Sequence, residues 1–201
     1  MDAVSTLGSL MGLSFISGMR LYSTVFAIGL GIRSGWIELP ARLSHLEPLA
    51  GTPILVIAGG IYVIEFLADK IPWIDSLWDV IHTFIRPIGA AALGVVAIGD
   101  VNPTVQIGAF LLCGSIGLAS HSAKAGTRLA ANHSPEPVSN IGLSLIEDGV
   151  VAAGAWAIFA HPVPVLIVVS LLLAIIVWLI PKLIRLFRRN LTRVMAPFRK
   201  A

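Results

Sequence analysis

The chain has 201 residues, of which 56% are hydrophobic and only 12% are charged, and its mean hydropathy is +0.89. Soluble domains carry about 25% charged residues, so the composition excludes an ordinary soluble protein and indicates one membrane domain. The net charge of +3 arises from a basic C-terminal end that directly follows an apolar run. This position favours contact with anionic lipid over nucleic-acid binding. The single cysteine, Cys113, excludes an intramolecular disulfide.

The apolar segments predict an all-α polytopic bundle with about six spans, because a spanning helix needs about 20 mostly apolar residues. The predicted spans are Leu7–Ile32, Pro53–Ala68, Pro87–Ile98, Thr104–Ser120, Ile141–Ala160 and Val165–Ile180. The first span lacks the positive region of a signal peptide, so we expect it to remain as a membrane helix. The short third span either extends back through the preceding amphipathic stretch or re-enters the membrane. We expect residues 1–181 to form the membrane domain and residues 182–201 a basic cytoplasmic tail.

The distribution of Lys and Arg predicts the orientation of this bundle. With six spans and the tail inside a bacterial inner membrane, both termini face the cytoplasm. The cytoplasmic segments then hold eleven Lys and Arg residues, against Arg33 and Arg42 outside. The eleven are Lys70, Arg86, Lys124, Arg128, Lys182, Arg185, Arg188, Arg189, Arg193, Arg199 and Lys200. Two polar islands, 68–79 and 121–128, therefore fall on the same side and are expected to approach each other in space.

The first polar island continues into an amphipathic stretch, Pro72–Arg86. If this stretch is helical, Asp75, Asp79, His82 and Arg86 form one polar stripe. One interpretation is an interfacial helix that lies on the membrane surface with charge pairs four residues apart. The alternative is a divalent metal site in which Asp75, Asp79 and His82 are the ligands.

The second polar island places Lys124 and Arg128 four residues apart, where they repel unless an anion lies between them. Candidates for that anion are a lipid phosphate, an anionic substrate, or carboxylates of the chain itself. Charges within membrane spans generally face a bundle interior or water, and they often mark a solute path. The predicted substrate path or binding site comprises Arg20, Glu65, Asp69, Lys70, His121, Lys124, Arg128, Asn140, Glu147 and Asp148.

A short internal similarity also favours a solute path. Gly18-Met19-Arg20 is echoed by Gly126-Thr127-Arg128, and each is followed by a helix that carries a pair of acidic residues. With three spans in each half, the two halves would form an inverted repeat. Such repeats are typical of transporters, whose substrate sites lie at the interface between the repeats.

Several motifs resemble one known family over nearly the whole chain. They are Ser17-Gly18-Met19-Arg20, the run from Glu65 to Pro72, Asp75 with Asp79, Arg86-Pro87, His121 with Lys124-Ala125-Gly126 and Arg128, Ser134-Pro135-Glu136-Pro137 with Ser139-Asn140, and Glu147-Asp148. With these motifs, the chain resembles an uncharacterised bacterial integral-membrane family, domain of unknown function 4126. The resemblance implies a small helical membrane protein and brings no established reaction.

The sequence favours a transporter or channel for a small polar or ionic solute, with no enzymatic activity and no assigned cofactor. A metal-dependent enzyme at the membrane surface is the alternative, acting on a lipid headgroup or a phosphorylated substrate with a divalent metal as cofactor. A structural membrane scaffold is a third hypothesis. The expected partners are membrane lipids and the solute, without nucleic acid. Contacts through Gly29, Gly31, Gly59 and Gly60 would allow a homo-oligomer.

Overall fold

The computed structural model describes residues 3–131 and 137–195, and within them every regular element is a helix. Eight helices follow one another, seven of them α-helices and one a 3-10 helix, η1. They are α1 (Ala3–Met19), α2 (Leu21–Arg33), η1 (Ala41–Ala50), α3 (Thr52–Ala68), α4 (Pro72–Ile98), α5 (Pro103–Ala131), α6 (Pro137–Ala160) and α7 (Pro162–Met195). The all-α prediction is therefore confirmed.

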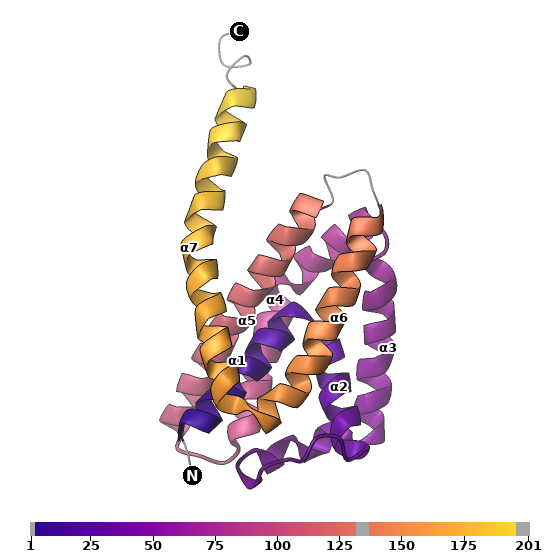
Figure 1. The fold of residues 1–201 in the computed structure, drawn as a ribbon, viewed down its shortest axis with the longest axis vertical. Coiled ribbons are helices and arrows are strands. Elements are labelled where there is room, and N and C mark those ends of the chain that lie inside the picture. Colours follow the sequence, from indigo (N-terminus) through magenta and orange to yellow (C-terminus); the bar gives the residue numbers. More distant parts are fainter. Residues whose placement is uncertain (1–2, 132–136, 196–201) are drawn as a thin grey trace.

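Helix α1 lies at the centre of the bundle and packs against α4, α5, α6 and α7 (Figure 1). Its small residues allow this close packing. A Cβ on Gly18 would lie 2.8 Å from the Cα of Gly117 on α5, and a Cβ on Gly12 would collide with Val165 and Ile158. The core consists of buried aliphatic side chains such as Leu13 and Ile28. By contrast, most large apolar side chains of α3, α4 and α7 face outward, as expected for helices in lipid.

Helices α1 and α2 form a hairpin, not the one continuous helix expected over Leu7–Ile32. They are joined by Arg20 alone, whose backbone is extended, with φ −150° and ψ 91°. At the start of α1, Ser9 Oγ donates to the carbonyl of Ile158 at 2.9 Å and accepts from Arg42 Nη2 of η1 at 3.2 Å. At the end of α2, Arg33 donates to Thr52 at 2.9 Å. The start of α1 and the end of α2 therefore lie at the same end of the bundle, and Arg20 is the apex between them.

The amphipathic stretch and the short third span form one helix, α4, as the extended alternative allowed. Pro87 lies inside this helix of 27 residues and does not end it. A proline is tolerated in a membrane helix where neighbouring groups satisfy the freed carbonyl. The polar stripe of α4 faces the bundle interior, because Asp75 and Arg86 are fully buried, while Leu77 and Ile81 are exposed. The stripe therefore does not lie on the membrane surface.

Four helices are long and apolar enough to cross a membrane: α4, α5, α6 and α7. A fifth span is formed if η1 and α3, bent by 72° at their junction, cross together. The six predicted spans and the inverted repeat are thus not confirmed among the described residues. Helix α1 begins at one end of the bundle and α7 extends well beyond the other (Figure 1). The orientation of the two termini relative to a membrane stays a prediction.

The glycines expected to support a homo-oligomer are largely occupied within the chain. A Cβ on Gly29 would collide with the Leu49 carbonyl, one on Gly31 with Ile37, and one on Gly59 would lie 2.9 Å from the Phe26 ring. Only Gly60 among the four faces open space. Three of these glycines therefore lie at contacts between α2 and other segments of the same chain. The homo-oligomer remains a prediction.

Candidate functional site

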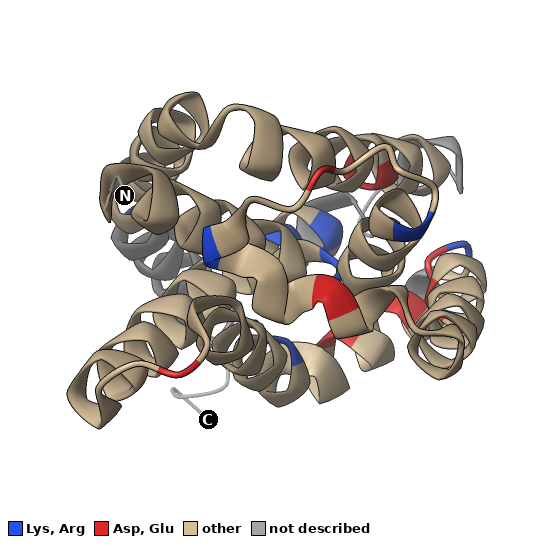
Figure 2. Ribbon diagram, turned by 90° about the horizontal axis from the view of Figure 1, so that it is seen from below, with Lys and Arg blue, Asp and Glu red and all other residues tan. Residues whose placement is uncertain are grey.

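The two polar islands meet inside the bundle, at the level of the hairpin apex. Seen from below, several of the Lys, Arg, Asp and Glu positions lie on helices in the middle of the bundle, and others lie at its edge (Figure 2). The ion pairs involve four cationic side chains and six carboxylates in two neighbouring groups, one around Arg20 and Arg128 and one around Arg86. We call this set the ion-pair network. Its members are Arg20, Arg86, Lys124, Arg128, Glu65, Asp69, Asp75, Asp79, Glu147 and Asp148.

Arg20 connects three carboxylates, two from α6 and one from the α3–α4 turn. Its Nε donates to Glu147 at 3.1 Å, Nη1 lies 3.2 Å from Asp148 Oδ1, and Nη2 pairs with Asp69. Nη2 also donates to Ser144 Oγ at 2.8 Å. The side chain is fully buried. Only a guanidinium offers separate donors in these directions, so the hairpin apex is fixed by Arg20.

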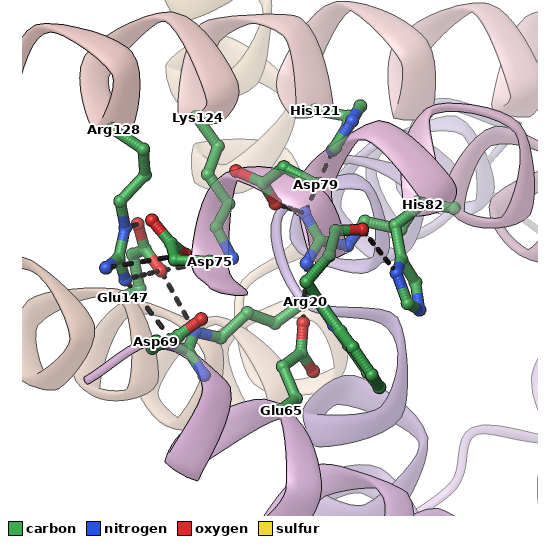
Figure 3. Close-up of polar contacts among 12 residues, drawn as sticks. Arg20, Glu65, Asp69, Asp75, Asp79, His82, His121, Lys124, Arg128 and Glu147 are labelled. Carbon is green, nitrogen blue, oxygen red and sulfur yellow. Dashed lines mark hydrogen bonds and ion pairs between the residues drawn. The ribbon is translucent and has the colours of Figure 1, made fainter. Parts of the chain in front are cut away.

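Arg128 and Lys124 approach the same carboxylates from α5 (Figure 3). Arg128 donates to both oxygens of Glu147, from Nε at 3.1 Å and from Nη2 at 2.9 Å. Lys124 Nζ lies 3.3 Å from Glu147 Oε2, and Arg128 Nη2 lies 3.3 Å from Asp69 Oδ2. The anion between Lys124 and Arg128 is therefore the Glu147 carboxylate. Of the lipid phosphate, the anionic substrate and a carboxylate of the chain, the structure supports the last.

Asp69 lies in the turn between α3 and α4, outside the spanning helices. Burial opposes ionisation of its carboxyl, but Lys124, Arg20 and Arg128 outweigh burial and lower its pKa. Ser144 Oγ adds a hydrogen bond to Asp69 at 3.1 Å. Asp69 is therefore ionised in the folded protein at neutral pH, and it is held by cations from both halves of the chain.

Arg86 forms a second centre within the network. Its Nη2 donates to Glu65 at 2.6 Å, and its Nη1 donates to Asp79 and to His121 Nδ1, each at 2.9 Å. His121 Nδ1 must therefore be an acceptor, so the proton of a neutral His121 is on Nε2. His121 Nε2 then donates to Thr83 Oγ1 at 3.2 Å. Thr83 Oγ1 can accept this hydrogen bond because its own hydrogen is donated to the Asp79 carbonyl. Arg86 thus fixes the tautomer of His121.

Arg86 and Ser144 are missing from the predicted site, although both belong to it. Arg86 lies seven residues after Asp79 and shares its helix face, so the polar stripe of α4 already contained the signal. Ser144 precedes Asp148 by one helical turn, and its hydroxyl contacts Arg20 and Asp69. Asn140, Ser144 and Asp148 are spaced four residues apart on one helix face, so the sequence already contained a signal for Ser144.

The remaining predicted path residues lie at the edge of the network or outside the described side chains. Lys70 Nζ donates to Ser144 Oγ at 3.3 Å and lies 3.7 Å from the ring centre of Phe66. The side chain of Asn140 lies outside the described residues.

The three predicted metal ligands do not converge on a common point. Within residues 3–131 and 137–195, no group of three His, Cys, Asp or Glu side chains is arranged to hold a metal ion. Asp79 instead accepts from Arg86, and Asp75 lies 3.8 Å from Arg128. His82 donates from Nδ1 to the Trp78 carbonyl at 2.7 Å. The polar stripe of α4 therefore supplies partners for two arginines.

A pocket of about 650 Å³ leads toward the network between α2, α3 and α6. We call it the aromatic pocket, because Phe26, Trp36, Tyr62 and Trp156 line it. Its lining follows α6 from Trp156 to Asp148, which is about 12 Å at 1.5 Å per residue. Trp36 lies after α2, at the end of the bundle that holds η1. The pocket thus reaches from this end to the carboxylate that pairs with Arg20.

The chain matches one family model over most of its length. The model is described as Domain of unknown function (DUF4126), and it covers residues 7–182. This match confirms the resemblance drawn from the motifs. No curated protein and no solved structure matches the chain.

Proposed function

This chain belongs to the DUF4126 family, and we propose that it moves a small polar or ionic solute across a membrane. One observation carries the proposal. The aromatic pocket ends at Asp148, and Asp148 pairs with Arg20 at the apex of the hairpin. A space large enough for a solute therefore meets the buried charges directly.

The proposed path continues from Asp148 through the ion-pair network. Arg20 and Arg128 both pair with Asp69 and Glu147. Arg128 is the last residue of the candidate span on α5, Pro103–Arg128. The path therefore enters at the η1 end, passes the hairpin apex and leaves at the end where α5 stops. Along it, four carboxylates face three cations, so the path holds more negative than positive side chains.

Helices that stop within the membrane support this function. Non-helical backbone at membrane depth is tolerated only where protein or water surrounds it, and Arg20 is fully buried. Discontinuous helices form the substrate sites of many transporters. The excess of Lys and Arg at the α7 end leads us to propose that this end faces the cytoplasm of a bacterial inner membrane.

The proposal is tested by solute flux into liposomes that contain the purified full-length protein. We expect flux of at least one small ion or polar solute, and we expect Asp148→Asn to abolish it while the protein stays folded. Asp100→Asn serves as the matched control, because Asp100 is exposed in the turn between α4 and α5. If folded protein moves none of a broad panel of cations, anions and neutral solutes, the proposal is overturned.

A further inference from the structure

The lining of the aromatic pocket selects among solutes. Four aromatic side chains line it, and Asp148 is the only Asp, Glu, His, Lys or Arg among the lining residues. The rings of Phe26 and Tyr62 stack with centroids 6.2 Å apart, which forms a continuous wall from α2 and α3. Trp36 and Trp156 are 79% and 52% exposed, so their rings are accessible at the mouth. Aromatic faces attract cations, and the indole of Trp attracts them best.

The negative charge of Asp148 is only partly neutralised. Arg20 is its ion-pair partner at 3.2 Å, but Arg20 also pairs with Asp69 and Glu147. The Asp148 side chain is 17% exposed and belongs to the pocket lining, although its two carboxylate oxygens are buried. Arg20 is fully buried and does not belong to the lining, so the carboxylate lies between a ligand in the pocket and the guanidinium.

We propose that the aromatic pocket binds an organic cation of the alkylammonium class. The aromatic rings would surround its alkyl groups, and Asp148 would pair with its charge. A bare Ca²⁺ or Mg²⁺ ion needs six or more oxygen ligands, whereas this lining offers one carboxylate and the hydroxyls of Ser23 and Tyr62. An anion would find no cationic side chain in the lining. The volume lies in the range of about 300–1,000 Å³ that is usual for small-molecule sites.

The organic-cation site names the class of solute for the proposed function. Binding can be tested without transport, and only the claim that the bound cation crosses the membrane rests on the proposed function. The first test is equilibrium binding of choline to the full-length protein in detergent. Its uncharged carbon isostere, dimethylbutanol, has nearly the same shape. We expect saturable choline binding and affinity for the isostere lower by about tenfold or more. Equal binding of the two, or no choline binding, overturns the inference.

Two substitutions place the binding in this pocket. We expect Trp36→Ala to weaken choline binding by about tenfold, because it removes an exposed ring at the mouth. Trp73→Ala is its matched control, since Trp73 is 72% exposed on α4 and lies outside the pocket lining. Asp148→Asn should weaken choline binding and leave the binding of the isostere unchanged. If Trp36→Ala and Asp148→Asn both bind choline like the unchanged protein, the assignment is overturned.

Flux measurements separate this inference from the proposed function. Choline binding in the pocket, with no flux of choline or of any other solute in the panel, supports the site and contradicts transport. Flux of another solute, without choline binding, supports transport and contradicts the organic-cation site.

Discussion

Arg20 pairs with three carboxylates at once, which requires the several separate donors of a guanidinium. We predict that Arg20→Gln lowers the free energy of unfolding by about 3–5 kcal/mol, because it leaves buried carboxylates without a cation. Thermal unfolding in detergent measures the change. Arg33→Gln is the control, since Arg33 is exposed and makes one described side-chain hydrogen bond, to Thr52. A loss for Arg20→Gln no larger than that of the control would contradict the role of Arg20 at the apex.

Asp69 links the network to acid stability. Its pKa is lowered in the folded protein, so its contribution is present above the pKa of the unfolded state, about 3.9. That contribution is lost as the pH falls through the lower pKa of the folded state. We predict that Asp69→Asn destabilises the protein at neutral pH and makes its stability less sensitive to acidification. Unfolding measured from neutral to acidic pH tests this, and an unchanged acid dependence would contradict it.

His121 and His82 should be opposite tautomers in the same protein. Arg86 donates to His121 Nδ1, which leaves the proton on Nε2, whereas His82 donates from Nδ1 to the Trp78 carbonyl. Nitrogen NMR of the ring atoms distinguishes the two forms. We predict the Nε2–H form for His121 and the Nδ1–H form for His82 at neutral pH. The same tautomer in both rings would exclude one of these two hydrogen bonds.

At the scale of elements, the contact between α1 and α5 depends on two glycines that face each other. We predict that Gly18→Ala destabilises the protein by about 1–3 kcal/mol, because a Cβ there meets the backbone of Gly117. Gly126→Ala is the matched control, since a Cβ at this helical position meets nothing within 4 Å. Alanine there should be neutral, or stabilising by up to about 1 kcal/mol. Equal effects of the two substitutions would show that α1 and α5 do not approach closely.

Local pattern could predict most helices but not how the first two turn. Helix α6 ends where the predicted fifth span ends, at Ala160, because His161-Pro162 breaks the apolar run. The reversal at Arg20 has no such signal, since no proline marks it and the apolar run continues on both sides. Its partners Asp69 and Glu147 lie far along the chain, so tertiary contacts set the reversal. Conversely, Pro87 is a helix-breaking signal in the sequence, but α4 continues through it.

At the scale of the whole molecule, the convergence of the two polar islands could be predicted while the topology could not. The bias of Lys and Arg places 68–79 and 121–128 on one side, and the ion pairs of Arg128 with Asp69 and Asp75 join them. Counting spans requires knowing which apolar runs cross completely. The apolar run Leu7–Ile32, which covers most of this hairpin, is close to the length of one tilted crossing, so composition alone cannot distinguish the hairpin from a span.

The hairpin of α1 and α2 determines which segments of the chain lie on the same side of the membrane. If α1 and α2 form a hairpin, Val4 and Ser44 lie on the same side of the membrane, and Ile71, in the α3–α4 turn, lies on the other. All three are exposed, whereas the native Cys113 is fully buried and should not react. We expect a membrane-impermeant thiol reagent added from one side to label Val4→Cys and Ser44→Cys together, and Ile71→Cys only from the other side. A single span over Leu7–Ile32 would instead place Val4 and Ser44 on opposite sides, so labelling that separates these two positions would overturn the hairpin and the solute path built on its apex.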